Sequence, residues 1–233
     1  MERAIECRYN GHILRGMLHL PEAAALKNVP AVIIFHSLLN DARGSHRTLV
    51  KMSRELAARG IACVRFDFLD FGDSDDFANY ADLQEVLGQA MAILEHTEKY
   101  PWLNGVYLCG CGASGLVAAS LANAVPERVK KLLLYGPTKL KLPRFRLKDK
   151  LEPELLAEAS TLLDVEQPYG GPVYLCLTQA DELGNRLSEQ VLTDYYQQNI
   201  KEIDHVHQFE HLQNDERVQQ MVFVNMAEFI LKK

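Results

Sequence analysis

Reactive side chains stand directly after several short apolar runs of this sequence. They include the imidazole of His36, the carboxylate of Asp181 and the imidazole of His211. An imidazole beside a carboxylate can act as a general base. The segments that follow the runs are residues 36–38, 67–76, 110–115, 136–137, 179–181 and 210–211. Because ligands bind at the carboxyl ends of parallel strands, we expect the functional site in these segments.

The apolar runs alternate with amphipathic stretches, which is typical of strands and helices that take turns. We predict strands at 4–9, 12–19, 31–35, 61–66, 106–109, 131–135, 173–177 and 205–209, and helices at 47–59, 81–100, 115–124, 187–198 and 216–231. Asn10-Gly11 between the first two strands indicates a tight hairpin. Buried strands joined by helices predict an α/β fold, with a doubly wound, mostly parallel sheet flanked by helices on both faces.

One segment interrupts this alternation. Residues 139–171 are basic first, then helical in pattern, and end with Gly170, Gly171 and Pro172. We predict a single domain over residues 1–233, in which 139–171 form a small lid insertion. A plain surface excursion is the alternative for this segment.

Composition and charge exclude several classes of function. The chain has 233 residues, 48% hydrophobic and 24% charged, so it can bury a large core without disulfides or a structural metal. A net charge of −6 leaves no basic excess for phosphates, so we expect no nucleic-acid partner. We expect no membrane partner either, because no long apolar run and no signal-peptide pattern is present. Five cysteines, mostly in apolar runs, favour buried reduced thiols in a cytoplasmic protein.

Two short patterns could suggest a metal or a nucleotide. Cys109-Gly-Cys111 has no second pair of ligands, which makes it a weak metal signature. The glycine-rich run at 110–115 lacks the dinucleotide spacing and the later acidic residue. We therefore expect neither a metal nor an organic cofactor.

Several stretches of the chain resemble a known enzyme family. They read AVIIFHS, KMSRELAARG, IACVRFDFLDFGDSDD, YLCGCGASGLVAASLA and KKLLLYGP, and they cover most of residues 30–137. They are similar to α/β-hydrolases of the serine-aminopeptidase-like type, and most of all to small bacterial feruloyl and cinnamoyl esterases. The segment PVYLCLTQAD and the region of His211 match more loosely. The resemblance implies the α/β-hydrolase fold and a relation to carboxylic ester hydrolases.

The family carries its nucleophile in a Gly-x-Ser-x-Gly-Gly turn between a strand and a helix, the nucleophile elbow. The register places Gly112 at the nucleophile, so the attacking side chain is absent, and Ser114 where the family has glycine. Cys111 and Ser114 are neighbours that could supply an offset nucleophile. The alternatives are core packing for Cys111 and close helix–strand approach for Ser114. A glycine at residue 112 would also relieve the strain of a positive φ.

The resemblance assigns the other catalytic side chains as well. Asp181 matches the acid that orients the histidine, and His211 matches the histidine. His207 and His205 compete for that role, although their alternation with Val206 indicates one solvent-facing side of a strand. A helix-capping or turn aspartate and an ordinary loop histidine are the alternatives for Asp181 and His211.

Backbone amides complete the expected site. The N–H groups of Leu38 and Ala113 match the oxyanion hole of the family. His36 and Ser37, together with the neighbours of Gly112, are expected to line the pocket.

Three functions are compatible with these residues. We favour a hydrolytically silent homologue, a pseudoenzyme that binds a small acyl or aromatic ligand as a monomer or homodimer. The first alternative is an active hydrolase on small esters or related carbonyl compounds that uses His211 and Asp181 with water or an offset nucleophile. The second alternative is a regulatory or interaction subunit.

Overall fold

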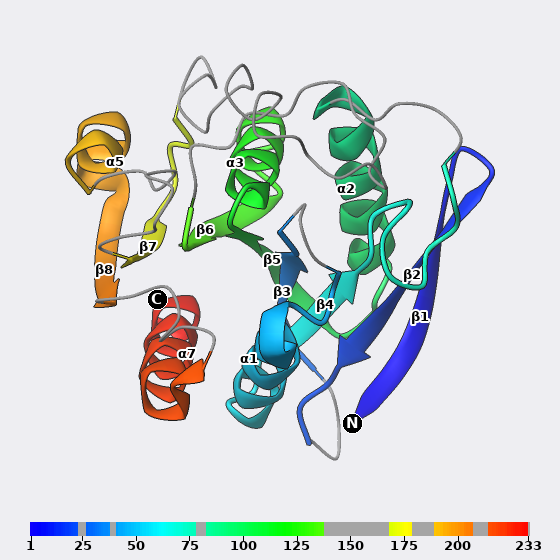
Figure 1. The fold of residues 1–233 in the computed structure, drawn as a ribbon, viewed down its shortest axis with the longest axis horizontal. Helices are drawn as coiled ribbons and strands as arrows, with labels where there is room; N and C mark the ends of the chain where they lie inside the picture. Colours follow the sequence, from blue (N-terminus) through cyan, green and yellow to red (C-terminus); the bar gives the residue numbers. More distant parts are fainter. Residues whose placement is uncertain are drawn as a thin grey trace.

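An eight-stranded sheet forms the centre of the protein in the computed structural model (Figure 1). The structure describes residues 1–22, 27–37, 41–77, 83–137, 168–178, 189–206 and 214–232. The strands are β1 (Glu2–Tyr9), β2 (His12–His19), β3 (Val29–Phe35), β4 (Ala62–Phe66), β5 (Leu103–Cys111), β6 (Val129–Tyr135), β7 (Val173–Thr178) and β8 (Ile200–Val206), in the order β1-β2-β4-β3-β5-β6-β7-β8. β2 pairs antiparallel with β1 and β4, and the other neighbours are parallel.

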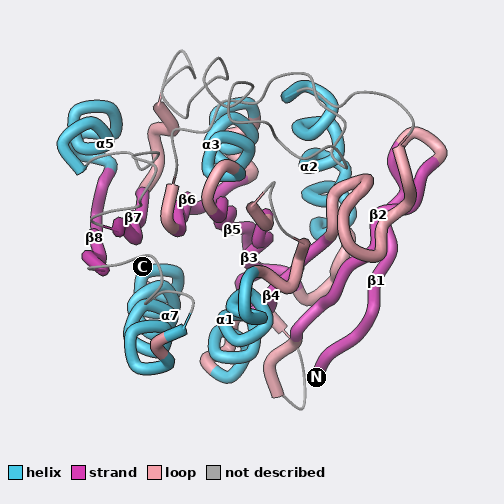
Figure 2. The backbone as a smooth tube through the Cα atoms, viewed as in Figure 1, coloured by secondary structure: helices cyan, strands magenta, loops and turns pink. Residues whose placement is uncertain are grey.

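Helices cover both faces of the sheet (Figures 1 and 2). On one side lie α2 (Leu83–Glu98), α3 (Ser114–Ala124) and α5 (Glu189–Tyr196), and on the other lie α1 (Thr48–Ala58) and α7 (Glu216–Leu231). Among the described residues, the 3-10 helix η1 (Ser45–Arg47) precedes α1, and the 3-10 helix η3 (Gln197–Asn199) lies between α5 and β8. Each side has its own apolar cluster: Val86, Val117 and Leu192 belong to one, and Met52 and Phe223 to the other. The predicted α/β fold with a mostly parallel sheet is confirmed.

The hairpin between β1 and β2 is confirmed as well. Asn10 and Gly11 have φ angles of 47° and 85°, and Tyr9 pairs with His12 across the turn. These positive φ angles are what a two-residue hairpin turn requires, and glycine and asparagine adopt them at low cost.

The last strand begins earlier than predicted. β8 starts at Ile200 rather than at residue 205 and includes residues 205–206 of the predicted strand, and residues 207–209 lie outside the described part of the chain. β8 is an edge strand in which only Val206 is buried, so its polar sequence lacks an apolar run that would mark it. His205 is exposed, as its alternation with Val206 predicts, and it pairs with Glu189 at 3.6 Å.

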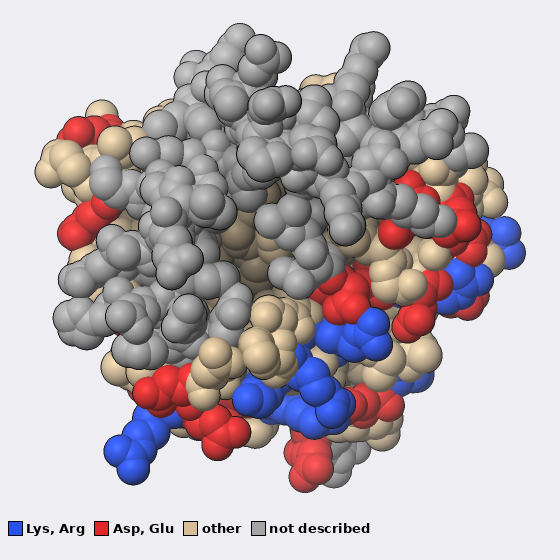
Figure 3. All heavy atoms as spheres, viewed as in Figure 1, with Lys and Arg blue, Asp and Glu red and all other residues tan. Residues whose placement is uncertain are grey.

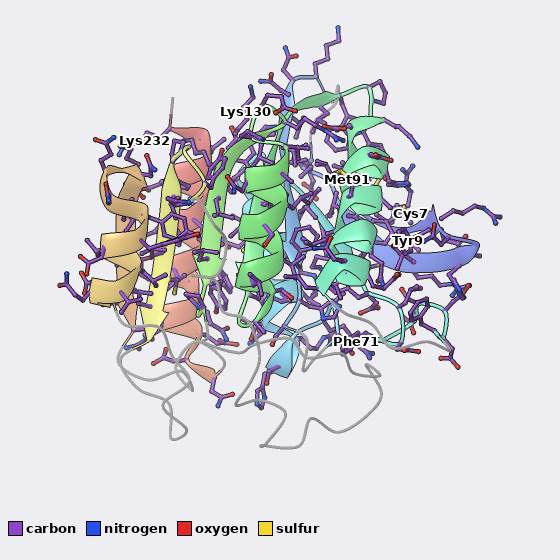
Figure 4. The ribbon with its side chains drawn as sticks, turned by 90° about the horizontal axis from the view of Figure 1, so that it is seen from above. Cys7, Tyr9, Phe71, Met91, Lys130 and Lys232 are labelled. Atoms are coloured by element: carbon purple, nitrogen blue, oxygen red, sulfur yellow. The ribbon has the colours of Figure 1, made fainter. Side chains whose placement is uncertain are left out.

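All five cysteines are buried free thiols, which confirms that part of the sequence prediction. Cys7 lies on β1 against α2, and its Sγ donates to the carbonyl oxygen of Ala92 at 3.4 Å (Figure 4).

Among the helices that the structure describes, none is both long and apolar enough to cross a membrane.

A buried histidine lies at the end of β2. The side chain of His19 is 1% exposed, and its Nε2 accepts a hydrogen bond from Nη2 of Arg65 at 2.8 Å. Burial, together with the charge of Arg65, lowers the pKa of His19 from 6.5 to about 4. His19 is therefore neutral in the folded protein at a pH where the unfolded chain binds a proton.

This histidine should make stability depend on pH. We expect it to lower the free energy of unfolding by about 2 kcal/mol between about pH 7 and about pH 5. The unfolded chain gains a proton below about pH 6.5 and the folded chain only below about pH 4, so stability falls as the pH falls through this window. Urea unfolding at both pH values measures the loss.

A matched variant isolates the contribution of His19. His19→Gln keeps an acceptor for Arg65 but cannot take up a proton. Over the same pH change, we expect the free energy of unfolding of His19→Gln to fall by about 2 kcal/mol less than that of the parent. Equal losses in the two proteins would contradict the assignment.

Candidate functional site

The turn at residues 110–114, called here the elbow turn, joins β5 to α3 near the middle of the sheet (Figure 1). Gly112 has a φ of +57°, and its N–H donates to the carbonyl oxygen of Tyr135 at 3.0 Å. Its own carbonyl accepts from the N–H of Gly115 at 3.1 Å. The turn is therefore sharp, and residue 112 has a left-handed conformation in which a side chain is strained.

A neighbouring loop fills the space that a side chain on residue 112 would need. A Cβ atom placed on Gly112 would lie 2.9 Å from Oγ of Ser37 and 3.3 Å from its Cβ. Ser37 stands in the segment after β3 and is half-buried. A hydroxyl thus lies directly beside the residue that the sequence places at the nucleophile position.

Gly110 allows α3 to pack closely on β5. A Cβ atom on Gly110 would lie 2.5 Å from the carbonyl oxygen of Ser114 and 2.7 Å from Cα of Gly115. Because these are backbone atoms, a side chain at residue 110 would push the helix away from the strand. The glycine thereby fixes where the first amides of α3 lie.

His36 and Ser114 join the segment after β3 to the helix. Oγ of Ser114 donates to the carbonyl oxygen of His36 at 2.6 Å, and the Ser114 side chain is fully buried. Nε2 of His36 accepts from the N–H of Phe68 at 3.1 Å, so Nδ1 carries the proton and donates to the carbonyl oxygen of Ser37 at 2.9 Å. Both side chains therefore hold backbone in place.

Aromatic rings enclose the imidazole of His36. Its centroid lies 5.1 Å from that of Phe68 and 5.0 Å from that of Phe71. Figure 4 shows Phe71 at one end of the sheet and Lys130, near the start of β6, at the other. The elbow turn follows the carboxyl end of β5. These groups therefore lie at the carboxyl ends of the parallel strands, where ligands bind in parallel α/β proteins.

Asp67 is a buried residue to which the sequence analysis assigned no role. Its Oδ1 accepts from the N–H of Ala42 at 2.6 Å and its Oδ2 from the N–H of Asp73 at 3.2 Å. Its carbonyl accepts from Oγ of Ser74 at 2.7 Å. One carboxylate therefore joins the segment after β3 to the segment after β4. An aspartate placed directly after a buried apolar run was the signal that could have identified it.

Cys111 precedes Gly112 and lies in the apolar cluster beneath α1 and α7. A hydrogen bond with the Cys109 thiol, together with burial, raises the pKa of Cys111 well above its usual range. Since the thiolate is the nucleophilic form of cysteine, this thiol is poorly suited to attack a carbonyl.

Some expected site residues cannot be placed. Leu38, Asp181 and His211 lie outside the described residues, as do His207 and residues 139–167 of the expected lid. Their roles stay predictions. The amide of Ala113, the other expected oxyanion donor, has no hydrogen-bond acceptor among the described residues. Within the same described ranges, no group of three or more His, Cys, Asp or Glu side chains could hold a metal ion.

A hollow of about 630 Å³ lies at the start of α1, in the chain segment that continues from Ser37. Its lining residues are Asp41, Arg43, Gly44, His46 and Arg47. A hydrogen bond to Asp41 raises the pKa of Arg43, so the guanidinium is charged and paired with that carboxylate. In Figure 3, basic and acidic residues lie side by side on the described part of this face.

Comparisons with known proteins were made by sequence and by structure. No model of a known family matches the sequence, and no curated protein matches it. Est1E from Butyrivibrio proteoclasticus, solved with ferulic acid bound, is similar in structure, with a TM-score of 0.78 and 20% identity over 97% of this chain and 98% of that chain.

Two further solved structures are similar over nearly the whole chain. The α/β-hydrolase GrgF from Penicillium sp. sh18 has a TM-score of 0.70 and 14% identity, covering 99% of both chains. An esterase from Pyrococcus furiosus has a TM-score of 0.73 and 14% identity, covering 99% of this chain and 90% of that chain. At these identities the likeness establishes the fold. The chain has the α/β-hydrolase fold, which these solved structures share.

Proposed function

We propose that this protein binds a small acyl or aromatic ligand beside the elbow turn and that residue 112 performs no nucleophilic attack. The observation that carries the proposal is Gly112, which has the sharp positive φ of an elbow but no side chain. Removing the nucleophilic serine from a serine hydrolase costs about 10⁶-fold in turnover, with binding and the oxyanion hole left intact. Loss of one side chain can therefore abolish the reaction and leave a binding site.

The remaining features of this edge support ligand binding. The amide of Ala113 stands at the N-terminus of α3, where the helix dipole favours negative charge. A carboxylate or ester oxygen is a suitable acceptor for such an amide. The structural likeness to Est1E, a protein solved with ferulic acid bound, suggests an aromatic carboxylate as the first ligand to test. In this proposal Leu38 supplies the second amide, and Asp181 and His211 line the same edge.

A second candidate function is hydrolysis with a nucleophile outside residue 112. The observation that favours it is the hydroxyl of Ser37, which lies 2.9 Å from the place of the absent Cβ. In contrast, the hydroxyl of Ser114 is fully buried and bonded to the backbone of His36. Cys111 is disfavoured by its raised pKa.

Calorimetric titration with ferulate tests the binding proposal. We expect binding to the parent and about tenfold or more weaker binding to Ala113→Pro, because proline has no N–H to donate to the carboxylate. The φ of Ala113 is −63°, which proline adopts without strain, and proline is accepted at the start of a helix.

Two controls complete this experiment. Thermal unfolding shows whether Ala113→Pro keeps the fold, and methyl ferulate shows whether an ester binds at the same place as the acid. Absence of binding to the parent by the acid and the ester would contradict the proposal. Equal ferulate affinity of the parent and a folded Ala113→Pro would show that the amide of Ala113 does not contact the ligand.

A further inference from the structure

The hydroxyl of Ser37 has no hydrogen-bond partner among the described residues, although it lies beside the elbow turn. Its distance to the absent Cβ of residue 112 is 2.9 Å, which is within the reach of one side chain. Gly112 of the elbow turn therefore has no side chain, and the hydroxyl of Ser37 lies where that side chain would begin. A hydroxyl is therefore present at this place, carried by residue 37.

The backbone that carries this hydroxyl is held on three sides. The carbonyl of Ser37 accepts from Nδ1 of His36, and the carbonyl of His36 accepts from Oγ of Ser114 at the start of α3. The N–H of Phe68 donates to the other ring nitrogen of His36. Residues 36 and 37 are therefore fixed to both α3 and the end of β4. A group held in this way can react without first being ordered, which lowers the entropic cost of attack.

We propose that Ser37 is an offset nucleophile that accepts acyl and phosphonyl groups in place of residue 112; this rests on the proposed function, because the acyl compound must bind beside the elbow turn. With an ester, Oγ of Ser37 forms a bond to the carbonyl carbon, the bond from that carbon to the alkoxide oxygen breaks, and the hydroxyl proton passes through water to the alkoxide, which leaves as the alcohol. Water then attacks the acyl-serine, which releases the carboxylic acid and restores the hydroxyl. The Ala113 amide and the N-terminus of α3 face the oxygen that becomes negative in each step.

Gly112 is part of this proposal. A side chain at residue 112 would occupy the space in front of Oγ of Ser37, since its Cβ would lie 2.9 Å from that oxygen. The glycine thus opens the approach to Ser37. Because Ser37 is half-buried rather than fully buried, its proton can leave to solvent.

A fluorophosphonate probe tests the proposal, with the adduct located by mass spectrometry of peptides. In this reaction Oγ forms a bond to phosphorus, fluoride leaves and the hydroxyl proton passes to water. We expect one adduct on the peptide that contains Ser37, and its loss in Ser37→Ala. Ser45→Ala is the matched control, because Ser45 lies in the same stretch of chain, outside the elbow turn, and its replacement should leave the adduct unchanged.

Hydrolysis of p-nitrophenyl acetate gives a second readout. We expect a slow turnover in the parent that falls to the background rate of buffer in Ser37→Ala. Unreacted parent protein, an adduct at another residue, or unchanged labelling and turnover in Ser37→Ala would each overturn the assignment. Ferulate binding to Ser37→Ala separates the two proposals: binding without any Ser37 adduct refutes the nucleophile and leaves the binding site standing.

Discussion

The double variant Ser37→Gly/Gly112→Ser exchanges the residues at positions 37 and 112. We expect its kcat/KM for ester hydrolysis to be about 100-fold or more above that of the parent. The exchange moves the hydroxyl from the segment after β3 to the apex of the elbow turn. There it stands at the head of α3, in the position from which an elbow serine attacks. Serine at the φ of +57° is strained by about 1–2 kcal/mol, which we expect to lower the stability of the exchanged protein rather than its rate of hydrolysis.

The single variants distinguish this effect from simple addition of a serine. Gly112→Ser alone puts its Cβ 2.9 Å from Oγ of Ser37, so the two side chains crowd each other and we expect little gain. Ser37→Gly alone has no hydroxyl at either place and should show only the background rate. The measurement is kcat/KM for p-nitrophenyl acetate, with fluorophosphonate labelling to show which residue reacts.

The exchanged protein also tests the residues that the structure does not place. If His211 and Asp181 act as base and orienting acid, His211→Ala in the exchanged background should return the rate to that of Ser37→Gly. If Ser37→Gly/Gly112→Ser hydrolyses the ester no faster than Ser37→Gly, the result would contradict the presence of the other catalytic groups of a serine hydrolase beside the elbow turn. If the double variant is active and His211→Ala leaves its rate unchanged, only the role of His211 as the general base would be excluded.

The sequence predicted those parts of the fold that depend on local patterns. Alternation and turn residues marked the hairpin at Asn10-Gly11, and the apolar run at 31–35 marked most of β3. The start of the edge strand β8 was missed because burial on an edge is partial and leaves no apolar run. β5 extends from Leu103 to Cys111, beyond the apolar run at 106–109, because pairing with β3 and β6 continues past that run at both ends.

The site depends on contacts that no local pattern contains. Gly112 could be identified from its register, but its contact with Ser37 joins two loops that are far apart in the sequence. Asp67 could be singled out by its place directly after a buried apolar run, but its hydrogen-bond partners could not. Its bonds to Ala42 and Asp73 follow from the adjacency of β3 and β4 in the sheet. Sequence therefore predicts which loops meet, while the partners of each side chain require the packed structure.

Gly110→Ala should lower the free energy of unfolding by about 3 kcal/mol or more, because the methyl group meets atoms that cannot move aside. Its Cβ would lie 2.5 Å from the Ser114 carbonyl oxygen, 2.7 Å from Cα of Gly115 and 2.9 Å from Cβ of Ala118. The φ of Gly110 is not in the left-handed region, so the effect is one of space and not of backbone strain.

Gly170→Ala is the matched control, since no atom of the described residues lies within 4 Å of its added Cβ and its φ is not in the left-handed region. We expect it to change stability by less than about 0.5 kcal/mol. Urea unfolding of the two variants measures the difference. Gly110→Ala/Ala118→Gly should recover part of the loss, because it removes one of the contacts and leaves the two with the backbone.

The same variant connects the packing of α3 to the chemistry of the site. If α3 moves away from β5, the amide of Ala113 moves with it, and Oγ of Ser114 loses its hold on the backbone of His36. Ferulate binding and the labelling of Ser37 should then weaken together in Gly110→Ala, even where enough folded protein remains to measure. A Gly110→Ala protein as stable as Gly170→Ala would mean that the helix does not pack on the strand at this distance. The positions of Ala113 and Ser37 beside the elbow turn would then lose their support.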